Sequence, residues 1–217
     1  MIPWENLVAF VLASAVIIVI PGPSVLFVIG RSIALGRRAG VLSVVGNSLG
    51  TIPAVVAVAF GVGAIVASSV VAFTVIKIVG ALYLVWLGIQ AIRHRRDGAA
   101  FATRRSSDLA VGTRSTWTLL RQGMVVGVTN PKTIAFFVAV LPQFVSPAAG
   151  PVWAQLLALG LLFQAMALVC DSTWALAAGT ARAWFARSPR RISGLAGAGG
   201  VMMIGLGGAL ALTGAKS

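Results

Sequence analysis

The chain alternates long uncharged apolar stretches with short polar segments. An apolar stretch of roughly 20 residues is long enough for a helix to cross the hydrocarbon core of a bilayer. The pattern predicts six such helices in one transmembrane domain, 1–217. Their expected ranges are 6–30, 40–64, 69–92, 122–145, 153–178 and 194–213. The expected fold class is therefore all-α, an integral membrane bundle of six transmembrane helices.

Composition agrees with this pattern. The 217 residues are 59% hydrophobic and 10% charged, and the mean hydropathy is +0.99. A soluble domain carries about 25% charged residues. A surface with so few charges requires lipid as its solvent, so the lipid bilayer is an expected partner.

The basic residues predict the orientation of the helices. A formal net charge of +13 would suggest nucleic-acid binding in a soluble protein. Here every Arg lies in one of three segments, 31–38, 93–121 and 182–191, whereas the turns expected near 64–69 and 146–152 carry no Lys or Arg. The positive-inside rule places Arg-rich segments in the cytoplasm. We therefore expect a cytoplasmic loop over 93–121, both termini outside, and no nucleic-acid partner.

Six helices divide into two halves of three. Because three is odd, the two halves enter the membrane in opposite directions, which is the geometry of inverted-repeat transporters. Pro21 interrupts the first predicted helix and Pro131 the fourth, about half a chain apart. Breaks at corresponding places in two repeats indicate a binding site. Two inverted three-helix repeats are the resulting hypothesis.

The first interruption is the segment Pro21-Gly22-Pro23-Ser24. Each proline removes a main-chain donor and clashes with the carbonyl four residues earlier. In lipid the freed carbonyls must find partners, so such a break faces protein or a hydrated cavity. The new helix N-terminus there favours a carboxylate. The alternative is a packing kink without a role in binding.

The second interruption, Thr129-Asn130-Pro131-Lys132, adds an amide and a cation near the middle of the fourth helix. A lysine inside the membrane costs several kcal/mol unless it is paired or hydrated, so it indicates a functional site. The alternative is a lysine that pairs structurally or extends to the interface.

Asp171 is the one carboxylate within a predicted helix. It either binds a substrate ammonium or a proton, or it serves as a structural partner of Lys132 or of a main-chain donor. With a rise of ~1.5 Å per residue, Pro21, Asn47, Lys132 and Asp171 all fall roughly 10–15 Å from the cytoplasmic ends of their helices. This shared depth predicts one polar site.

Three further residues are weaker candidates. Asn47 lies between Gly46 and Gly50, whose spacing permits close helix packing, and its amide is expected to face the site. Trp174, one turn after Asp171, is expected to line the cavity. Lys77 is either functional or a lysine that snorkels to the outer interface.

Several other functions are open on this evidence. A metal-cation exporter needs clustered carboxylates, His or Cys, but the predicted helices hold a single Asp and no His, and Cys170 is the one cysteine. No set of catalytic groups is present, so an enzyme is not expected. An exporter of another small solute, or a membrane protein without transport activity, remains as an alternative.

The order of these motifs resembles the LysE/RhtB family of amino-acid exporters over nearly the whole chain. Pro21-Gly22-Pro23 is similar to the first-helix signature of that family. The stretch 77–88, KIVGALYLVWLG, is similar to its third-helix pattern. Residues 123–144 and the pair Asp171 and Trp174 resemble its fourth and fifth helices.

The resemblance implies secondary active export of amino acids or their derivatives by proton antiport across the bacterial inner membrane. It implies no organic cofactor and no metal, and a homodimer is compatible with it. Family substrates range from basic amino acids to homoserine, threonine and leucine. Ser24 follows Pro-Gly-Pro here, where the family often has Asn or Asp.

The mechanistic hypothesis is a site for a zwitterion between the two halves. The substrate carboxylate meets Lys132 and the broken helix ends, the ammonium meets Asp171, and a proton on Asp171 replaces the ammonium. The predicted substrate-binding residues are Pro21, Gly22, Pro23, Ser24, Asn47, Asn130, Pro131, Lys132, Asp171 and Trp174, with Lys77 as a further candidate.

Overall fold

The computed structural model describes residues 2–19, 22–94, 115–180 and 189–212, and these are helical with no strand. The first half contains α1 (Trp4–Val19), α2 (Pro23–Leu35), α3 (Arg37–Ala57), the π-helix η1 (Val58–Val62), α4 (Gly63–Ser68) and α5 (Val70–Arg93). The second half contains α7 (Thr116–Val128), α8 (Pro131–Ala135), the π-helix η2 (Phe136–Val140), the 3-10 helices η3 (Leu141–Phe144) and η4 (Pro147–Ala149), α9 (Val152–Thr180) and α11 (Pro189–Leu212).

The described helices include several that are long and apolar enough to cross a membrane. Three qualify as single helices: Arg37–Ile65, Val71–Arg93 and Val152–Thr180. Two bent pairs, α1 with α2 and α7 with α8 to η3, raise the number to five when each pair is counted as one span. A 24-residue helix, α11, occupies the sixth predicted segment. The all-helical membrane class is confirmed, and the total of six spans stays a prediction.

The first and fourth predicted helices are bent rather than straight. The bend is 49° between α1 and α2 and 43° between α7 and α8 to η3. Each second piece begins with a proline, Pro23 in α2 and Pro131 in α8. Proline suits the first position of a helix, because the N–H that it lacks has no partner there. Pro21 lies outside the described residues.

Several helix boundaries differ from the predicted ones. The sequence predicts that the first helix ends at residue 30, with Arg31 at the cytoplasmic face. Instead α2 continues to Leu35 and buries Arg31. The predicted loop 93–121 is shorter, since α7 begins at Thr116. The turn predicted near 64–69 is present, because Ser69 is extended and accepts a hydrogen bond from the N–H of Ala72 at the start of α5.

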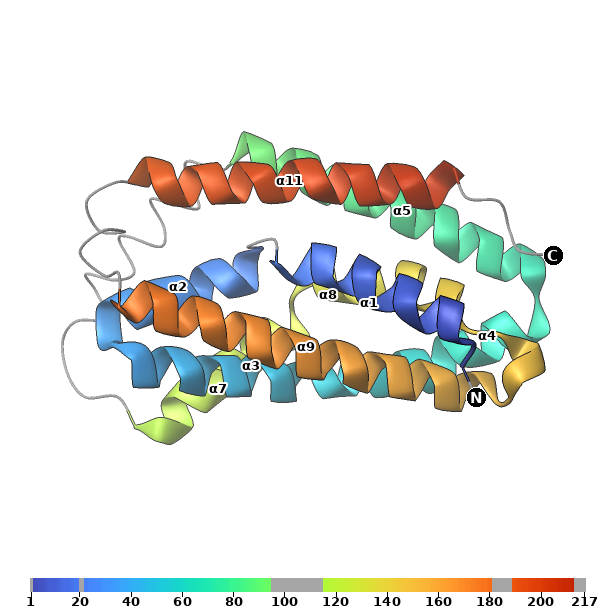
Figure 1. Ribbon diagram of the computed structural model, residues 1–217, viewed down its shortest axis with the longest axis horizontal. Helices are drawn as coiled ribbons and strands as arrows, with labels where there is room; N and C mark the ends of the chain where they lie inside the picture. Colours follow the sequence, from blue (N-terminus) through green and yellow to red (C-terminus); the bar gives the residue numbers. More distant parts are fainter. Residues whose placement is uncertain (1, 20–21, 95–114, 181–188, 213–217) are drawn as a thin grey trace.

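The helices lie roughly along one long axis (Figure 1). Helices α5 and α11 pack side by side along one face, and α3 packs against α7 and α9 on the other side of the bundle. The bent pair α1 and α2 contacts α9 from within this arrangement. In Figure 1, α1 begins and α11 ends at the same end of the bundle, opposite the junction of α2 and α3.

Glycines set the separation of α3 and α7. A Cβ atom added to Gly46 or Gly50 would collide with main-chain carbonyls of α7, and one added to Gly123 or Gly127 would collide with main-chain carbonyls of α3. Small residues at a four-residue spacing allow such backbone contact between membrane helices. The contact anchors the segment that carries Asn47 against the helix that leads to α8.

An aromatic cluster joins α1, η2 and α9. The ring centroids of Phe136 and Phe163 lie 4.9 Å apart, and those of Phe137 and Phe163 lie 5.0 Å apart. Phe10 adds a third contact to Phe136 at 6.2 Å. Such aromatic pairs contribute about 0.5–1.5 kcal/mol beyond the area that they bury. They form a wall beside the polar residues described next.

Candidate functional site

The break between α1 and α2 exposes a main-chain acceptor. The proline at position 21 has no N–H, so the carbonyl of Ile17, four residues earlier, has no helical donor from that position. The ammonium of Lys132 donates a 2.9 Å hydrogen bond to this oxygen. Lys132 is 4% exposed and belongs to α8. The lysine of the second break therefore bonds to the carbonyl that the first break releases.

Gly22 makes room for this lysine. It caps the N-terminus of α2 with an extended backbone, φ −88° and ψ −169°. A Cβ atom at Gly22 would lie 3.0 Å from Lys132 Cε and 3.1 Å from Nζ. These separations are shorter than ordinary van der Waals contact, so a side chain at position 22 requires Lys132 to move.

Asn130 ties the two breaks together from the other side. Its Oδ1 accepts a 3.2 Å hydrogen bond from the N–H of Lys132, which caps α8. Its Nδ2 donates a 3.0 Å hydrogen bond to the hydroxyl of Ser24 in the first turn of α2. The N-terminal ends of α2 and α8 consequently lie next to each other.

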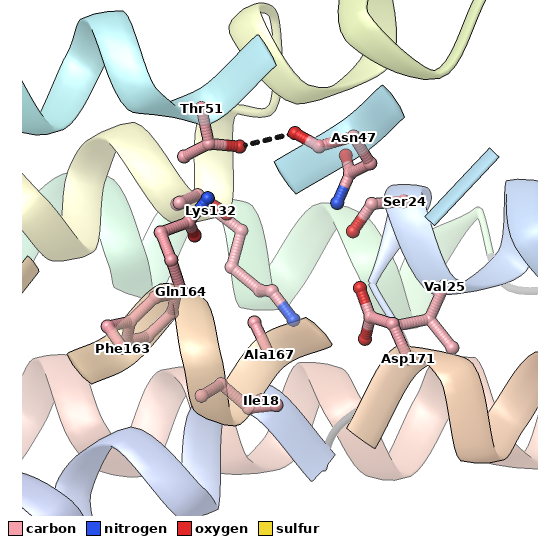
Figure 2. A pocket seen from close by; sticks show the side chains of 11 residues that line it. Ile18, Ser24, Val25, Asn47, Thr51, Lys132, Phe163, Gln164, Ala167 and Asp171 are labelled. Atoms are coloured by element: carbon pink, nitrogen blue, oxygen red, sulfur yellow. Dashed lines mark hydrogen bonds between the residues drawn. The ribbon is translucent and has the colours of Figure 1, made fainter. Parts of the chain in front are cut away.

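Lys132 and Asp171 share one small cavity. Asp171 lies on α9 and is 5% exposed. The cavity is lined by Ile18, Ser24, Val25, Asn47, Thr51, Lys132, Thr133, Phe163, Gln164, Ala167 and Asp171. Figure 2 shows the Lys132 ammonium, the Asp171 carboxylate, the Ser24 hydroxyl and the Asn47 amide directed toward the same space. The lysine and the aspartate interact electrostatically across it.

The cavity is smaller than an amino acid. It offers about 20 Å³ to the centre of a water molecule, which is room for one or two waters. The structure thus has the site closed around its own polar groups, and a larger solute requires the walls to separate.

The remaining walls combine uncharged polar and apolar side chains. Thr51 donates a 2.9 Å hydrogen bond to the main-chain oxygen of Asn47, and Gln164 donates one of 2.8 Å to the main-chain oxygen of Ser48. The side-chain oxygen of Asn47 is buried without a hydrogen-bond partner among the described residues. The Asn47 amide therefore retains capacity for a ligand.

Sequence reasoning missed some cavity residues. Thr51 lies one turn after Asn47, Thr133 follows Lys132, and Gln164 lies two turns before Asp171. Helical spacing from Asn47 and Asp171 offered a signal for Thr51 and Gln164, whereas Thr133, one residue after Lys132, had none. Phe163 carried no such signal, because its place depends on the packing of η2 against α9.

Other predicted site residues lie outside the cavity lining. Trp174 is partly buried against the apolar cluster of Val25, Ile29 and Ala178. Pro23 is exposed, and Pro131 is partly buried at the start of α8. Lys77 is 3% exposed on α5, so its side chain is buried within the protein rather than extended along its surface.

Arg31 is a buried cation that the sequence placed at the membrane surface. It is 1% exposed, and its Nη2 donates a 2.6 Å hydrogen bond to Oε1 of Gln122 on α7. Its guanidinium lies 4.9 Å from the centroid of the Phe27 ring. The sequence did not predict this burial, because Arg31 lies near the expected end of a helix and charge alone does not distinguish a buried Arg from a solvated one.

Metal-ligating groups do not gather in the parts of the chain that the structure describes. No group of three or more His, Cys, Asp or Glu residues there lies close enough to hold an ion. The charged part of the cavity is one ammonium and one carboxylate.

An apolar exterior, two bent helix pairs among the described helices and a buried charged cavity are the features of a helical membrane protein with an internal polar site. The chain belongs to the LysE type translocator family, whose model matches residues 15–214. This confirms the resemblance drawn from the motifs. The protein is a multi-pass protein of the bacterial inner membrane, in a family of exporters.

Relatives resemble the chain over most of its length. An "Uncharacterized membrane protein" of Vibrio cholerae is 37% identical over 92% of this chain and 93% of its own. The "Homoserine/homoserine lactone efflux protein" of Salmonella typhimurium is 32% identical over 94% of each. The "Leucine efflux protein" of an Enterobacter strain is 31% identical over 66% of this chain and 65% of its own. No solved structure matches the chain.

Proposed function

We propose that the protein exports amino acids or their derivatives from the cytoplasm by proton antiport. The observation that carries this proposal is that buried Lys132 and Asp171 line one cavity. An amino acid carries a carboxylate and an ammonium on one carbon, so a nearby cation and anion complement it. The names of two relatives, which specify homoserine and leucine efflux, support the same substrate class.

The charge balance of the cavity favours a zwitterion over a metal cation. Lys132 and Asp171 are the charged residues in its lining, and their formal charges cancel. A zwitterion enters without adding net charge to a low-dielectric site, whereas a cation leaves one charge uncompensated. The hydroxyl groups of Ser24 and Thr51 and the amide of Asn47, which also line the cavity, provide further hydrogen bonds to a substrate of zero net charge.

The substrate carboxylate replaces the carbonyl of Ile17 as the acceptor of the Lys132 ammonium. In the closed site this ammonium bonds to the carbonyl of Ile17, a neutral acceptor. A carboxylate makes the stronger, charge-assisted bond. The first turn of α2, at Ser24, adds main-chain N–H groups with the favourable end of the helix dipole. Binding thus exchanges an internal hydrogen bond for a substrate contact and loosens the link between α1 and α8.

Asp171 couples substrate to protons. Ionised, it binds the substrate ammonium; once a proton arrives from the outside, the neutral acid no longer holds that ammonium. The substrate then leaves and the protonated carrier returns. Each cycle exchanges a substrate for a proton at one carboxylate, which is antiport by competition.

Alternating access follows from two inverted halves of three spans, within a single transporter domain 1–217. A bent helix pair begins each half, and the helices that end the two halves, α5 and α11, pack against each other. In this topology the loop 93–121 is cytoplasmic and both termini are outside. Helix α1 begins and α11 ends at the same end of the bundle (Figure 1), which supports the placement of both termini on one side of the membrane.

The test is amino-acid efflux from proteoliposomes under an imposed pH gradient. Wild-type protein is expected to release labelled leucine or homoserine faster when protons flow inward, and Asp171→Asn is expected to lose this acceleration. Glu5→Gln removes an exposed carboxylate and serves as the matched control. Acceleration equal to wild type in Asp171→Asn rejects the coupling role. Failure of wild type to carry any amino acid in a counterflow panel rejects amino-acid export and favours another small solute.

A further inference from the structure

Arg31 is the largest of the fully buried side chains in the described residues, at 1% exposure. It belongs to α2, the helix whose first turn forms a wall of the cavity. A cation buried in a membrane helix is energetically costly, and such residues mark the routes of substrates and ions. The zwitterion site itself uses Lys132 and Asp171, so Arg31 has no part in it.

The place of Arg31 in the helix is informative. Ser24 and Arg31 are seven residues apart, so they lie on the same face of α2 and roughly 10 Å apart along it. Beyond Arg31, α2 ends at Leu35, and the exposed Arg37 and Arg38 open α3. Exposed arginines at a helix end are typical of the cytoplasmic side. Arg31 therefore stands between the cytoplasmic end of the bundle and the cavity, on the side from which an exported solute enters.

The contacts of Arg31 join the two bent spans a second time. Its 2.6 Å hydrogen bond goes to Gln122 on α7, eight residues before the Asn130 that bonds Ser24. The seam between the spans is thus held at two levels, by Ser24 with Asn130 beside the cavity and by Arg31 with Gln122 nearer the cytoplasm. At the level nearer the cytoplasm, one acceptor of the guanidinium is the neutral amide oxygen of Gln122.

A carboxylate is a better ligand for that guanidinium than an amide. Arginine presents several donors in a planar fork that matches a carboxylate, and charge-assisted hydrogen bonds are about twice as strong as neutral ones. The ring of Phe27 beside the guanidinium keeps it oriented across the seam. Gln122 accepts a hydrogen bond from one donor of Arg31. A carboxylate, as the stronger acceptor, can displace it.

We propose that Arg31 is a second site for the substrate carboxylate, placed on the cytoplasmic entry route, and that displacement of Gln122 from it opens the seam toward the cavity. The proposal rests on amino-acid export as the function. It assigns Arg31 to the cytoplasm-facing state alone, so its effect depends on the side from which substrate arrives.

The experiment compares transport from the two membrane faces with substrates that have or lack a carboxylate. Inside-out and right-side-out vesicles present the cytoplasmic and outer faces. Two probe pairs are available, leucine with leucinamide and homoserine with homoserine lactone, and the first member of each pair has the carboxylate. The experiment uses the pair that wild type transports. For Arg31→Gln, the KM of the carboxylate-bearing probe at the cytoplasmic face is expected to rise roughly tenfold or more. The KM of its partner probe, and both KM values at the outer face, are expected to change much less.

Gln122→Glu separates binding from simple structural linkage. The substitution strengthens the bond to Arg31. If that bond is purely structural, the KM at the cytoplasmic face stays the same or falls. If Arg31 binds the substrate, the KM of the carboxylate probe at that face rises, because the new carboxylate competes for Arg31. Arg38→Gln, which removes an exposed arginine of α3, is the matched control. Equal effects on both probes, or on both faces, or an unchanged KM in Gln122→Glu, overturn the role of Arg31. A wild type that carries neither pair overturns amino-acid export as well.

Discussion

The ammonium of Lys132 on α8 and the main-chain carbonyl of Ile17 on α1 are joined by a 2.9 Å hydrogen bond. This bond couples the two bent spans at the point where the backbone of each is interrupted. The same ammonium lines the cavity that holds Asp171. The group expected to bind substrate is therefore also one that holds the closed site together.

Replacement of Lys132 by Met is expected to abolish efflux and to lower the stability of the protein. The substitution removes the cation and leaves the buried carbonyl of Ile17 without its donor, which costs about 1–3 kcal/mol. Efflux from proteoliposomes and unfolding in detergent measure the two effects. Lys132→Arg keeps the charge and is expected to retain more stability than Lys132→Met. Wild-type efflux in Lys132→Met would contradict the assignment.

Gly22→Ala is expected to slow efflux by displacing the lysine. The added Cβ lies at 3.0 Å from Lys132 Cε, so the flexible end of the lysine has to shift away from Ile17. Gly61→Ala is the matched control, because nothing lies within 4 Å of a Cβ there. Initial efflux rates of the two variants, at equal protein amounts, provide the comparison. The explanation fails if Gly22→Ala matches Gly61→Ala.

The hydrogen bond from Asn130 to Ser24 is expected to contribute about 1 kcal/mol to the closed state. A double-mutant cycle with Ser24→Ala and Asn130→Ala measures it as the departure of the double variant from additivity. Thr173→Ala removes an exposed hydroxyl that bonds its own helix and is expected to be nearly neutral. Strict additivity of Ser24→Ala and Asn130→Ala would show that the contact contributes nothing.

Gly50→Ala is expected to destabilise the bundle by about 1–3 kcal/mol, the usual cost of overpacking. Its Cβ would collide with the main-chain carbonyl of Met124, and backbone does not yield as a side chain does. Gly205→Ala meets nothing within 4 Å and is the control. Thermal unfolding of the two purified variants tests the difference, and equal midpoints would contradict the close contact of α3 with α7.

The sequence anticipated which charged residues share the cavity better than it anticipated their contacts. Depth along a helix follows from residue number, so the common level of Asn47, Lys132 and Asp171 was predictable. The freed carbonyl near Pro21 was predictable as well, but the donor that reaches it was not. Which donor lies nearest depends on how the two bent spans rotate against each other, and no periodicity in either span encodes that rotation.

Arg31 shows the limit of reading boundaries from charge. Arginines at positions 37 and 38 lie at the exposed start of α3, as the pattern predicts. Arg31 carries the same charge only two turns away, yet it is buried against Phe27 and Gln122. Its environment is set by the packing of α2 on α7, a tertiary contact that a hydropathy pattern does not contain.

The most direct test of the account measures whether Lys132 holds the substrate carboxylate. Binding of leucine and leucinamide, or of homoserine and its lactone, is compared in wild type and Lys132→Gln, with Asp171→Asn as a second reference. We expect wild type to prefer the carboxylate-bearing ligand by roughly tenfold or more, the size of effect expected for a charge-assisted hydrogen bond. We expect Lys132→Gln to lose most of that preference and to keep at most the part that Arg31 contributes. A preference that persists undiminished in Lys132→Gln would contradict the account.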